Sequence, residues 1–304
     1  MTTPKKTSEP ALTEAHLETD AIMAELRALR VASLEHRQRH DRPPRLPSRK
    51  TLADIADGLS AALFPNRLGS PELTDGGVDH YVRQTLDTAL RKLQQQVRRE
   101  LHYAASSETD SNTTHEQATA ITRAFAGCLP QIRSLLDNDI YAAYEGDPAA
   151  RSVDEVLVCY PGISAIMYYR LAHELYRLGV PLIARMISEI AHSATGIEIH
   201  PGAQIDSSFF IDHGTGVVIG ETAIIGKNVR LYQAVTLGAK RFPVDEHGAL
   251  VKGNARHPIV EDDVVIYAGA TILGRITIGR GSTIGGNVWL THSVPPGSNI
   301  SQAQ

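Results

Sequence analysis

An aliphatic or small side chain returns at every sixth position from Ile199 onward. A period of six matches neither the 3.6-residue period of a helix nor the two-residue alternation of an ordinary strand. Each hexad is therefore predicted to form a short strand and a turn. Stacked hexads form a parallel β-helix, in which the sixth-residue side chain points into a narrow core. These positions are Ile199, Ile205, Ile211, Val217, Ala223, Val229, Val235, Val260, Ile266, Ile272, Ile278, Ile284 and Leu290.

The regular register of this repeat separates the β-helix from the main alternative, an antiparallel β-sandwich. Sandwich turns recur every ~8–12 residues with variable spacing. Here the register is predicted to continue without slip on both sides of one interruption. That interruption separates Val235 from Val260 by 25 residues, and its central part, at about 238–257, contains proline, glycine and charged residues. We predict an excursion loop on a rigid scaffold, where binding and catalytic residues tend to lie.

The composition is that of an ordinary globular protein. The chain has 304 residues, of which 42% are hydrophobic and 21% charged, and this length suggests two domains. The formal net charge of −4 gives no general attraction to nucleic acid or to an anionic membrane. Neither kind of partner is expected.

Cysteine content and the N-terminus predict a cytoplasmic location. Cys128 and Cys159 are too few for a disulfide framework, so a reducing compartment is expected. The N-terminus lacks the apolar stretch of a secretory signal. No uncharged apolar run approaches the length that spans a bilayer.

Helical spacing of apolar residues dominates the chain before the hexads. Residues 1–50 are predicted to form a polar extension and linker with one helix, Leu12–Arg39, and residues 51–196 an α-helical domain. Residues 197–304 form the hexapeptide-repeat domain. The predicted fold class is therefore α+β, an N-terminal α-helical domain followed by a C-terminal left-handed parallel β-helix.

Histidines and acidic residues gather on and near the repeats, which need few polar residues to fold. His213 follows Glu198 by 15 residues, a little less than one coil of about 18 residues. The two side chains are therefore predicted to face each other across adjacent coils. A carboxylate fixes the tautomer of an imidazole, whose other nitrogen can take a proton from a substrate hydroxyl. Taken alone, such a histidine is more often structural than catalytic.

Several segments together carry a specific resemblance to one enzyme family. They are EIHPGA (198–203), IDHGTGVVIGET (211–222), VTLGA (235–239), RHP (256–258) and GGNVWL (285–290). With them the chain resembles the serine O-acetyltransferases, and the last segment and the long N-terminal extension resemble the longer, epsilon-type bacterial branch. The resemblance covers about half of the chain, from Asp147 to Gln304.

The resemblance implies a reaction and a catalytic pair. An acetyl group passes from acetyl-CoA to the hydroxyl of L-serine, which gives O-acetyl-L-serine and CoA in cysteine biosynthesis. His213 matches the family's catalytic base and Glu198 the acid that orients it. In many relatives that acid is an aspartate, so the glutamate is a small departure.

The resemblance also implies the residues that bind serine. Asp147 matches an aspartate that holds the ammonium group, and Asp212 matches a second acid of the same site. Arg256 is expected to pair with the serine carboxylate, for which a planar guanidinium is well suited, and His257 to lie beside the reacting centre. The same residues fit an amino acid with a hydroxyl group. Its ammonium and carboxylate groups need an anion and a cation at opposite ends of the site, and its hydroxyl needs a base between them.

For the acetyl donor, the resemblance implies a groove in which backbone groups bind the pantetheine arm. Small residues that permit this approach are Gly238, Ala239, Ala268 and Gly286. Acetyl-CoA is a co-substrate, and no permanently bound cofactor or metal is expected. The sequence identifies no donor for the oxyanion of the tetrahedral intermediate.

The family resemblance implies a homo-trimer or a dimer of trimers, with active sites between subunits. It also implies feedback inhibition by L-cysteine at the serine pocket. Some relatives bind O-acetylserine sulfhydrylase through a C-terminal isoleucine. This chain ends Ser301-Gln302-Ala303-Gln304, so that partner is not expected.

Three other functions compete with this assignment. One is acetyl transfer to another acceptor, such as homoserine or an amino sugar, and the amino sugar would leave Asp147, Arg256 and His257 without a purpose. A second is a zinc-dependent lyase like the gamma-class carbonic anhydrases, with His200, His213 and His257 as candidate ligands. The third is a passive trimeric scaffold.

Overall fold

The structure is a computed structural model that describes residues 19–36, 45–104, 111–241, 246, 248, 250–251 and 253–302. The chain divides into two compact units, Met1–Pro44 and Arg45–Gln304. In the first unit the described residues form one helix, α1 (Thr19–His36). The predicted helix Leu12–Arg39 is confirmed over these residues, and its other positions lie outside the described residues.

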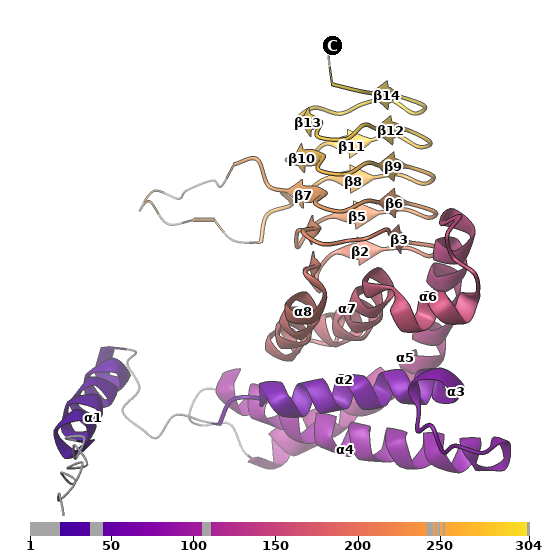
Figure 1. Cartoon of the computed structure of the whole chain (residues 1–304). Coiled ribbons are helices and arrows are strands. Elements are labelled where there is room, and N and C mark those ends of the chain that lie inside the picture. The colour runs from indigo at the N-terminus through magenta and orange to yellow at the C-terminus, as the bar shows by residue number, and fades with distance from the viewer. Residues whose placement is uncertain are drawn as a thin grey trace, which may run out of the picture. The chain divides into compact units, whose positions relative to one another are not determined.

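The second unit begins with helices that pack on one another (Figure 1). Apolar residues at helical spacing form their core, and Leu52, Leu93 and Ile132 are at most 1% exposed. Among the described residues, no helix has the length and apolar character needed to cross a lipid bilayer. The helices are α2 (Arg49–Leu63), α3 (Pro65–Leu68), the 3-10 helix η1 (Asp75–Gly77), α4 (Val78–Ala104), α5 (Ser111–Gly146), α6 (Val153–Cys159), α7 (Pro161–Arg177) and α8 (Pro181–Thr195).

The last helix before the strands is fixed at both ends. Its first N–H groups lack partners within the helix, and the buried Glu100 carboxylate of α4 accepts from the backbone of Leu182 and Ile183 at 2.8 Å each. It ends at Gly196, whose φ of 70° suits the left-handed position that closes a helix. The chain then enters the first strand directly.

The second part of this unit is the predicted left-handed parallel β-helix (Figure 1). Successive strands pass from sheet to sheet, so three parallel sheets enclose the core. We name them A (β1, β4, β7, β10, β13), B (β2, β5, β8, β11) and C (β3, β6, β9, β12, β14). The strands are β1 (Glu198–Ile199), β2 (Gln204–Ile205), β3 (Phe210–Ile211), β4 (Val218–Ile219), β5 (Ile224–Ile225), β6 (Arg230–Leu231), β7 (Thr236–Gly238), β8 (Ile259–Val260), β9 (Val265–Ile266), β10 (Thr271–Leu273), β11 (Thr277–Ile278), β12 (Thr283–Ile284), β13 (Trp289–Leu290) and β14 (Asn299–Ile300).

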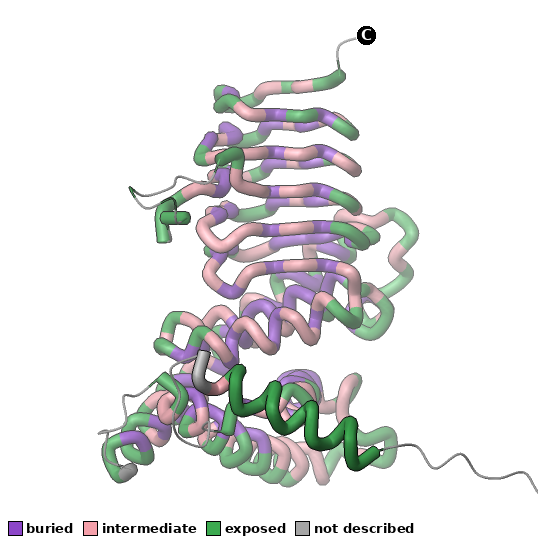
Figure 2. The backbone as a smooth tube through the Cα atoms, turned by 90° about the vertical axis from the view of Figure 1, so that its left-hand side faces the viewer, coloured by how far each residue is buried: buried purple, intermediate pink, exposed green. Residues whose placement is uncertain are grey.

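Every predicted hexad position is buried, with an exposed fraction of at most 9%. Figure 2 shows these buried positions recurring from coil to coil. The predicted unbroken register is nevertheless wrong at one point. Ile199 pairs with Ile219, a coil of 20 residues, whereas Val260 pairs with Ile278, a coil of 18. Two extra residues therefore lie between β3 and β4.

A buried ion pair joins the helices to the first coil of the β-helix. Arg170 of α7 donates to both carboxylate oxygens of Asp139 of α5, at 2.6 and 2.9 Å, and the two side chains are 4% and 0% exposed. Arg170 also donates to the carbonyl oxygens of Ile205 and Asp206. The Phe209 N–H donates to Asp139 at 2.9 Å. The pair therefore fixes β2 and β3 on α5 and α7.

Candidate active site

The corner between sheets C and A, which we call the CA corner, carries the predicted base. Asp212 and His213 directly follow β3, within the longer first coil. His213 has a φ of 57° and Gly214 a φ of 85°, and the Gly214 N–H donates to the Asp212 carbonyl oxygen at 2.6 Å. A left-handed conformation is uncommon for a non-glycine residue and recurs at functional sites. It leaves the His213 side chain 69% exposed, with Nδ1 3.6 Å from Oδ1 of Asp212.

Asp147 lies near the same corner, just after the end of α5. Its Oδ2 accepts a hydrogen bond from the Tyr160 hydroxyl at 2.5 Å, and its Oδ1 accepts from the Ala149 N–H at 2.8 Å. These bonds, with smaller effects of the charges on His213 and Arg230, lower the pKa of Asp147. The same hydrogen bond raises the pKa of Tyr160 to about 12. The pair is therefore a carboxylate held by a neutral phenol.

The corner between sheets A and B, the AB corner, holds Arg256. Its Nη2 donates to Oε2 of Glu221 at 2.7 Å, and the other oxygen of Glu221 accepts from the Tyr176 hydroxyl at 3.1 Å. Burial alone would raise the pKa of Glu221, but these hydrogen bonds and the nearby positive charges lower it. Arg256 is thus held by an ionised carboxylate. Among its described contacts, its Nη1 donates to the Asn254 carbonyl oxygen at 3.2 Å.

His257 of the AB corner is buried, in contrast to His213. It is 6% exposed, and its Nδ1 accepts from the Thr222 N–H at 3.0 Å. A Cβ atom at Gly220 would overlap the imidazole ring, so the close approach requires glycine there. Burial, followed by the charge of Arg256, lowers the pKa of His257 to about 4. Near neutral pH the ring is therefore uncharged and carries its hydrogen on Nε2.

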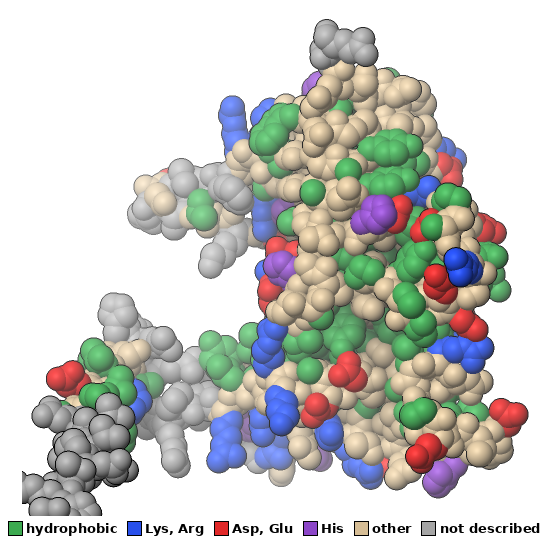
Figure 3. Space-filling model, in the orientation of Figure 1, with side chains coloured by type: hydrophobic (Ala, Val, Ile, Leu, Met, Phe, Trp, Pro, Cys, Tyr) green, Lys and Arg blue, Asp and Glu red, His purple; other side chains and the backbone are tan. Residues whose placement is uncertain are grey.

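The chain separates the predicted amino-acid site into two clusters. Asp147, Asp212 and His213 lie at the CA corner, and Arg256 and His257 at the AB corner, with sheet A between them. Within the described part of the chain, no hydrogen bond or ion pair joins one cluster to the other. Figure 3 shows histidine side chains beside acidic ones at separate places on the β-helix. Among the described residues, the carboxylates predicted to hold the ammonium and the guanidinium predicted to hold the carboxylate therefore lie at different corners of the chain.

Known proteins share the repeat and most of the fold. Residues 257–292 match the family model described as bacterial transferase hexapeptide (six repeats). A plasmid-encoded serine acetyltransferase of Synechococcus elongatus is 57% identical over 289 residues, which cover 94% of this chain and 91% of that protein. The chain belongs to the serine acetyltransferase family.

Solved structures of this family have the same fold. Serine acetyltransferase 1 of Entamoeba histolytica in complex with L-cysteine is 38% identical, with a TM-score of 0.72 over 82% of this chain and 86% of that one. A soybean serine acetyltransferase complexed with serine is 31% identical, with a TM-score of 0.54 over 82% of this chain and 95% of that one. Membership of the family makes this protein an acyltransferase enzyme.

The predicted contact of Glu198 with His213 does not form within the described chain. Glu198 Oε1 instead accepts from Nη2 of Arg185, in α8, at 3.2 Å. The reason lies in the coil geometry, because Glu198 lies within β1 and pairs with Val218 of β4, whereas His213 lies before β4 at the corner. The carboxylate nearest to His213 in this structure is that of Asp212.

The small residues expected to line the pantetheine groove divide between the same two corners. Ala268 and Gly286 each lie two residues after a strand of sheet C, as His213 does, so all three lie at the CA corner. The coil of β6 separates His213 from Ala268. A Cβ atom at Gly286 would come within 3.2 Å of the Ala268 carbonyl oxygen. Gly238 and Ala239 lie at the AB corner, where the predicted excursion loop begins. None of these four residues is buried.

Two residues that complete these clusters were not assigned a role from the sequence. Tyr160 is separated from Asp147 by 13 residues and by α6, so only the fold brings them together. Glu221 lies in the family segment 211–222, but nothing in the sequence pairs it with Arg256, which comes 35 residues later. The loop between β7 and β8 produces that contact.

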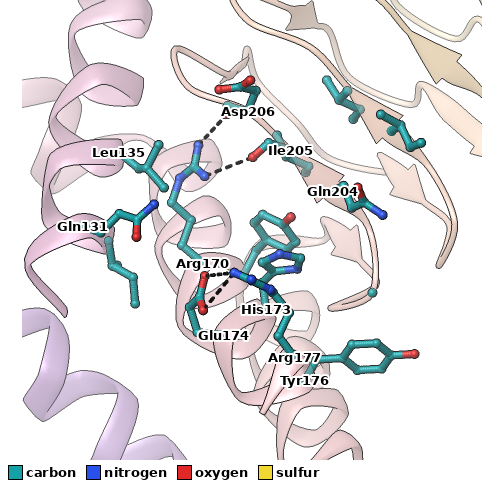
Figure 4. Close-up of a pocket in the computed structure, with 15 residues that line it drawn as sticks. Gln131, Leu135, Arg170, His173, Glu174, Tyr176, Arg177, Gln204, Ile205 and Asp206 are labelled. Carbon is teal, nitrogen blue, oxygen red and sulfur yellow. Dashed lines mark hydrogen bonds and ion pairs between the residues drawn. The ribbon is translucent and has the colours of Figure 1, made fainter. Parts of the chain in front are cut away.

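A separate cavity of about 870 Å³ lies between α5, α7 and the first coils of the β-helix (Figure 4). Its lining includes Gln131, Arg170, His173 and Gln204, and none of the predicted site residues. Arg170 is already bonded to the backbone of the β-helix there. Among the described residues, no three His, Cys, Asp or Glu side chains come together as a metal site would require.

Proposed function

We propose that this protein transfers the acetyl group of acetyl-CoA to the hydroxyl of L-serine, which gives O-acetyl-L-serine and CoA for cysteine biosynthesis. The observation that carries the proposal is the CA corner, where an exposed imidazole lies beside two carboxylates. An amino-acid alcohol needs this combination, because its ammonium requires an anion and its hydroxyl requires a base. Relatives crystallised with serine and with L-cysteine support the same substrate class.

In the proposed reaction, His213 takes the proton of the serine hydroxyl as the oxygen attacks the thioester carbonyl carbon. The tetrahedral intermediate then breaks its C–S bond, and the imidazolium returns the proton to the CoA sulfur. Asp147 and Asp212 hold the serine ammonium during both steps. Because Glu198 is bound to Arg185 in this structure, Asp212, whose Oδ1 lies 3.6 Å from Nδ1 of His213, is proposed as the carboxylate that orients the base.

Arg256 and His257 are proposed to bind the serine carboxylate from a neighbouring copy of the chain. Arg256 keeps donors beyond those used by Glu221, and the buried neutral His257 offers an N–H. Since both lie at the AB corner, a symmetric homo-trimer in which each AB corner faces the next CA corner would complete three sites. Pairing of trimers into a hexamer remains a prediction.

The acetyl donor is proposed to lie along this junction. Its pantetheine arm would follow Ala268 and Gly286 above His213 in one copy, with Gly238 and Ala239 of the next copy opposite. Adjacent strands are about 4.8 Å apart, so an extended arm that crosses three coils would bring the thioester to His213. L-cysteine differs from L-serine by one atom and is proposed to inhibit by occupying the same site. The protein is proposed to act in the cytoplasm.

Thiol release from acetyl-CoA with L-serine tests this function. The wild-type protein should favour L-serine over L-homoserine and glucosamine. The His213→Ala variant should lose about 100-fold or more of kcat, the range for removal of a general base. Preference for the sugar, or little loss in the variant, would reject the assignment.

A further inference from the structure

Tyr160 fixes the orientation of the Asp147 carboxylate. Its hydroxyl donates to Oδ2 at 2.5 Å, while the backbone N–H of Ala149 donates to Oδ1 at 2.8 Å. With one donor on each oxygen, the carboxylate cannot rotate without losing a charge-assisted hydrogen bond. The lone pairs that remain on both oxygens are free for a further donor.

Tyr160 is itself held by the start of α7. It is the N-cap residue of that helix, its N–H donates to the Val156 carbonyl oxygen at 3.2 Å, and its carbonyl oxygen accepts from Ile163 at 3.1 Å. At Gly162 a Cβ atom would overlap the carbonyl oxygen of Ile211. The first turn of α7 therefore packs directly against the end of β3.

This contact links the phenol to the predicted base. Ile211 is the last residue of β3, and Asp212 and His213 follow it without a break. The tyrosine that holds Asp147 and the turn that carries His213 thus rest on the same strand end. The charges of His213 and Asp212 both act on this pair, the first on Asp147 and the second on Tyr160.

We propose that Tyr160 is a positioning residue for the amino-acid substrate, which holds the Asp147 carboxylate where it receives the ammonium group at a fixed place relative to His213. This inference rests on the proposed function. Tyr160 does not take part in proton transfer, because its hydroxyl hydrogen is engaged by Asp147 and its raised pKa keeps it neutral. Its loss should therefore weaken serine binding and leave the chemical step largely intact.

Steady-state kinetics of Tyr160→Phe, with a matched control, tests the role. The control is Tyr168→Phe, which also removes a tyrosine–aspartate hydrogen bond, the one to Asp57, away from both corners. A hydrogen bond to a charged group contributes about 1.5–3 kcal/mol, so Tyr160→Phe should raise the KM for L-serine about 10-fold or more. The kcat and the KM for acetyl-CoA should change less than about twofold, and Tyr168→Phe should change none of the three.

An acceptor without an ammonium group gives a second readout. 3-Hydroxypropionate keeps the hydroxyl and the carboxylate of serine, so Tyr160→Phe should reduce kcat/KM for L-serine about 10-fold and leave kcat/KM for this acceptor unchanged. In an Asp147→Asn background, Tyr160→Phe should add less than about twofold to the KM for L-serine, because it acts through that carboxylate.

These variants separate failure of this proposal from failure of the function. If Asp147→Asn raises the KM for L-serine but Tyr160→Phe behaves as Tyr168→Phe does, the role of Tyr160 is refuted and the serine site stands. Equal losses for both acceptors, or fully additive effects of the two substitutions, would also refute it. If Asp147→Asn leaves the KM for L-serine unchanged, the proposed role of Asp147 in serine binding is refuted, and so is the role of Tyr160.

Discussion

The side chain of His213 is exposed and that of His257 is buried, and the local backbone conformation determines both. The left-handed φ of 57° at His213 costs on the order of 1–3 kcal/mol and turns the ring out to solvent. His257 is instead packed against Gly220, with its Nδ1 occupied by the Thr222 N–H. An exposed imidazole can exchange a proton with substrate, whereas a buried neutral one can only donate a hydrogen bond. The proposed proton transfer therefore falls to His213 and not to His257.

The buried state of His257 predicts a pH dependence of stability. Its pKa of about 4 in the folded protein lies below the ordinary value of 6.5, so the unfolded chain binds more protons between these values. The free energy of unfolding should therefore fall as the pH decreases from 6.5 towards 4, by up to about 3 kcal/mol for this group. The lowered pKa values of His173 and His200 act in the same direction.

Urea unfolding at pH 7, 6 and 5 and at a fixed protein concentration measures this slope. His257→Gln keeps an acceptor for Thr222 and cannot be protonated, so it should lose part of the wild-type decrease. It should not lose all of it, since two other histidines remain. An identical slope in the variant would show that His257 is protonated equally in both states.

The hexad repeat does not predict which carboxylate orients the imidazole of His213. The spacing of Glu198 and His213 assumed a coil of about 18 residues, but that coil has 20. The partner of Glu198, Arg185, comes from α8, and a contact between a helix and a strand leaves no trace in the hexad pattern. In contrast, the segment IDHGTG and its family resemblance predict His213 as the base, and the structure places its exposed side chain at the CA corner.

At the scale of elements, the hexads predicted the architecture because the narrow core admits little besides aliphatic and small side chains. The insertion is not visible in the repeat because each hexad has two inward positions, the strand residue and the residue two before it. Val217 and Ile219 are both at most 1% exposed, as are Val229 and Leu231. A two-residue insertion exchanges one inward position for the other and preserves the period of six. The insertion falls where the turn places His213.

The buried pair of Asp139 and Arg170 should make a large contribution to stability. Asp139→Asn removes the charge that compensates a guanidinium only 4% exposed. Breaking one side of a buried pair typically costs about 3–5 kcal/mol. We expect the urea midpoint of unfolding to fall accordingly, while α5 and α7 lose their attachment to β2 and β3.

A surface pair provides the control for that experiment. Asp87 and Arg91 form an ion pair of 2.6 Å with both side chains more than half exposed, so Asp87→Asn should cost less than about 1 kcal/mol. Replacing both buried partners, in Asp139→Asn with Arg170→Met, should recover part of the loss because no unpaired charge remains. Equal costs for Asp139→Asn and Asp87→Asn would contradict the structural role of the buried pair.

At the scale of the whole molecule, the decisive feature is that one chain presents the two halves of the predicted amino-acid site at different corners. The sequence indicated the residues but not this division, because their corners depend on the number of residues in each coil. The loop between β7 and β8 makes its coil 35 residues long, as the pairing of Ile225 with Val260 shows. It thereby carries Arg256 and His257 back to the AB corner beside Glu221.

A site shared between copies predicts that two inactive variants restore activity together. His213→Ala damages the CA corner and Arg256→Ala the AB corner, so each homo-trimer alone should be nearly inactive. In trimers assembled at random from equal amounts of both chains, about one quarter of the junctions combine an intact CA corner with an intact AB corner. Purification of co-expressed chains through two different tags removes the homo-trimers, and each mixed trimer then has one intact junction of three. The doubly purified protein should therefore recover about a third of the wild-type kcat. If each site lay within one chain, every site would carry a lesion, and the mixed trimers would be as inactive as either parent.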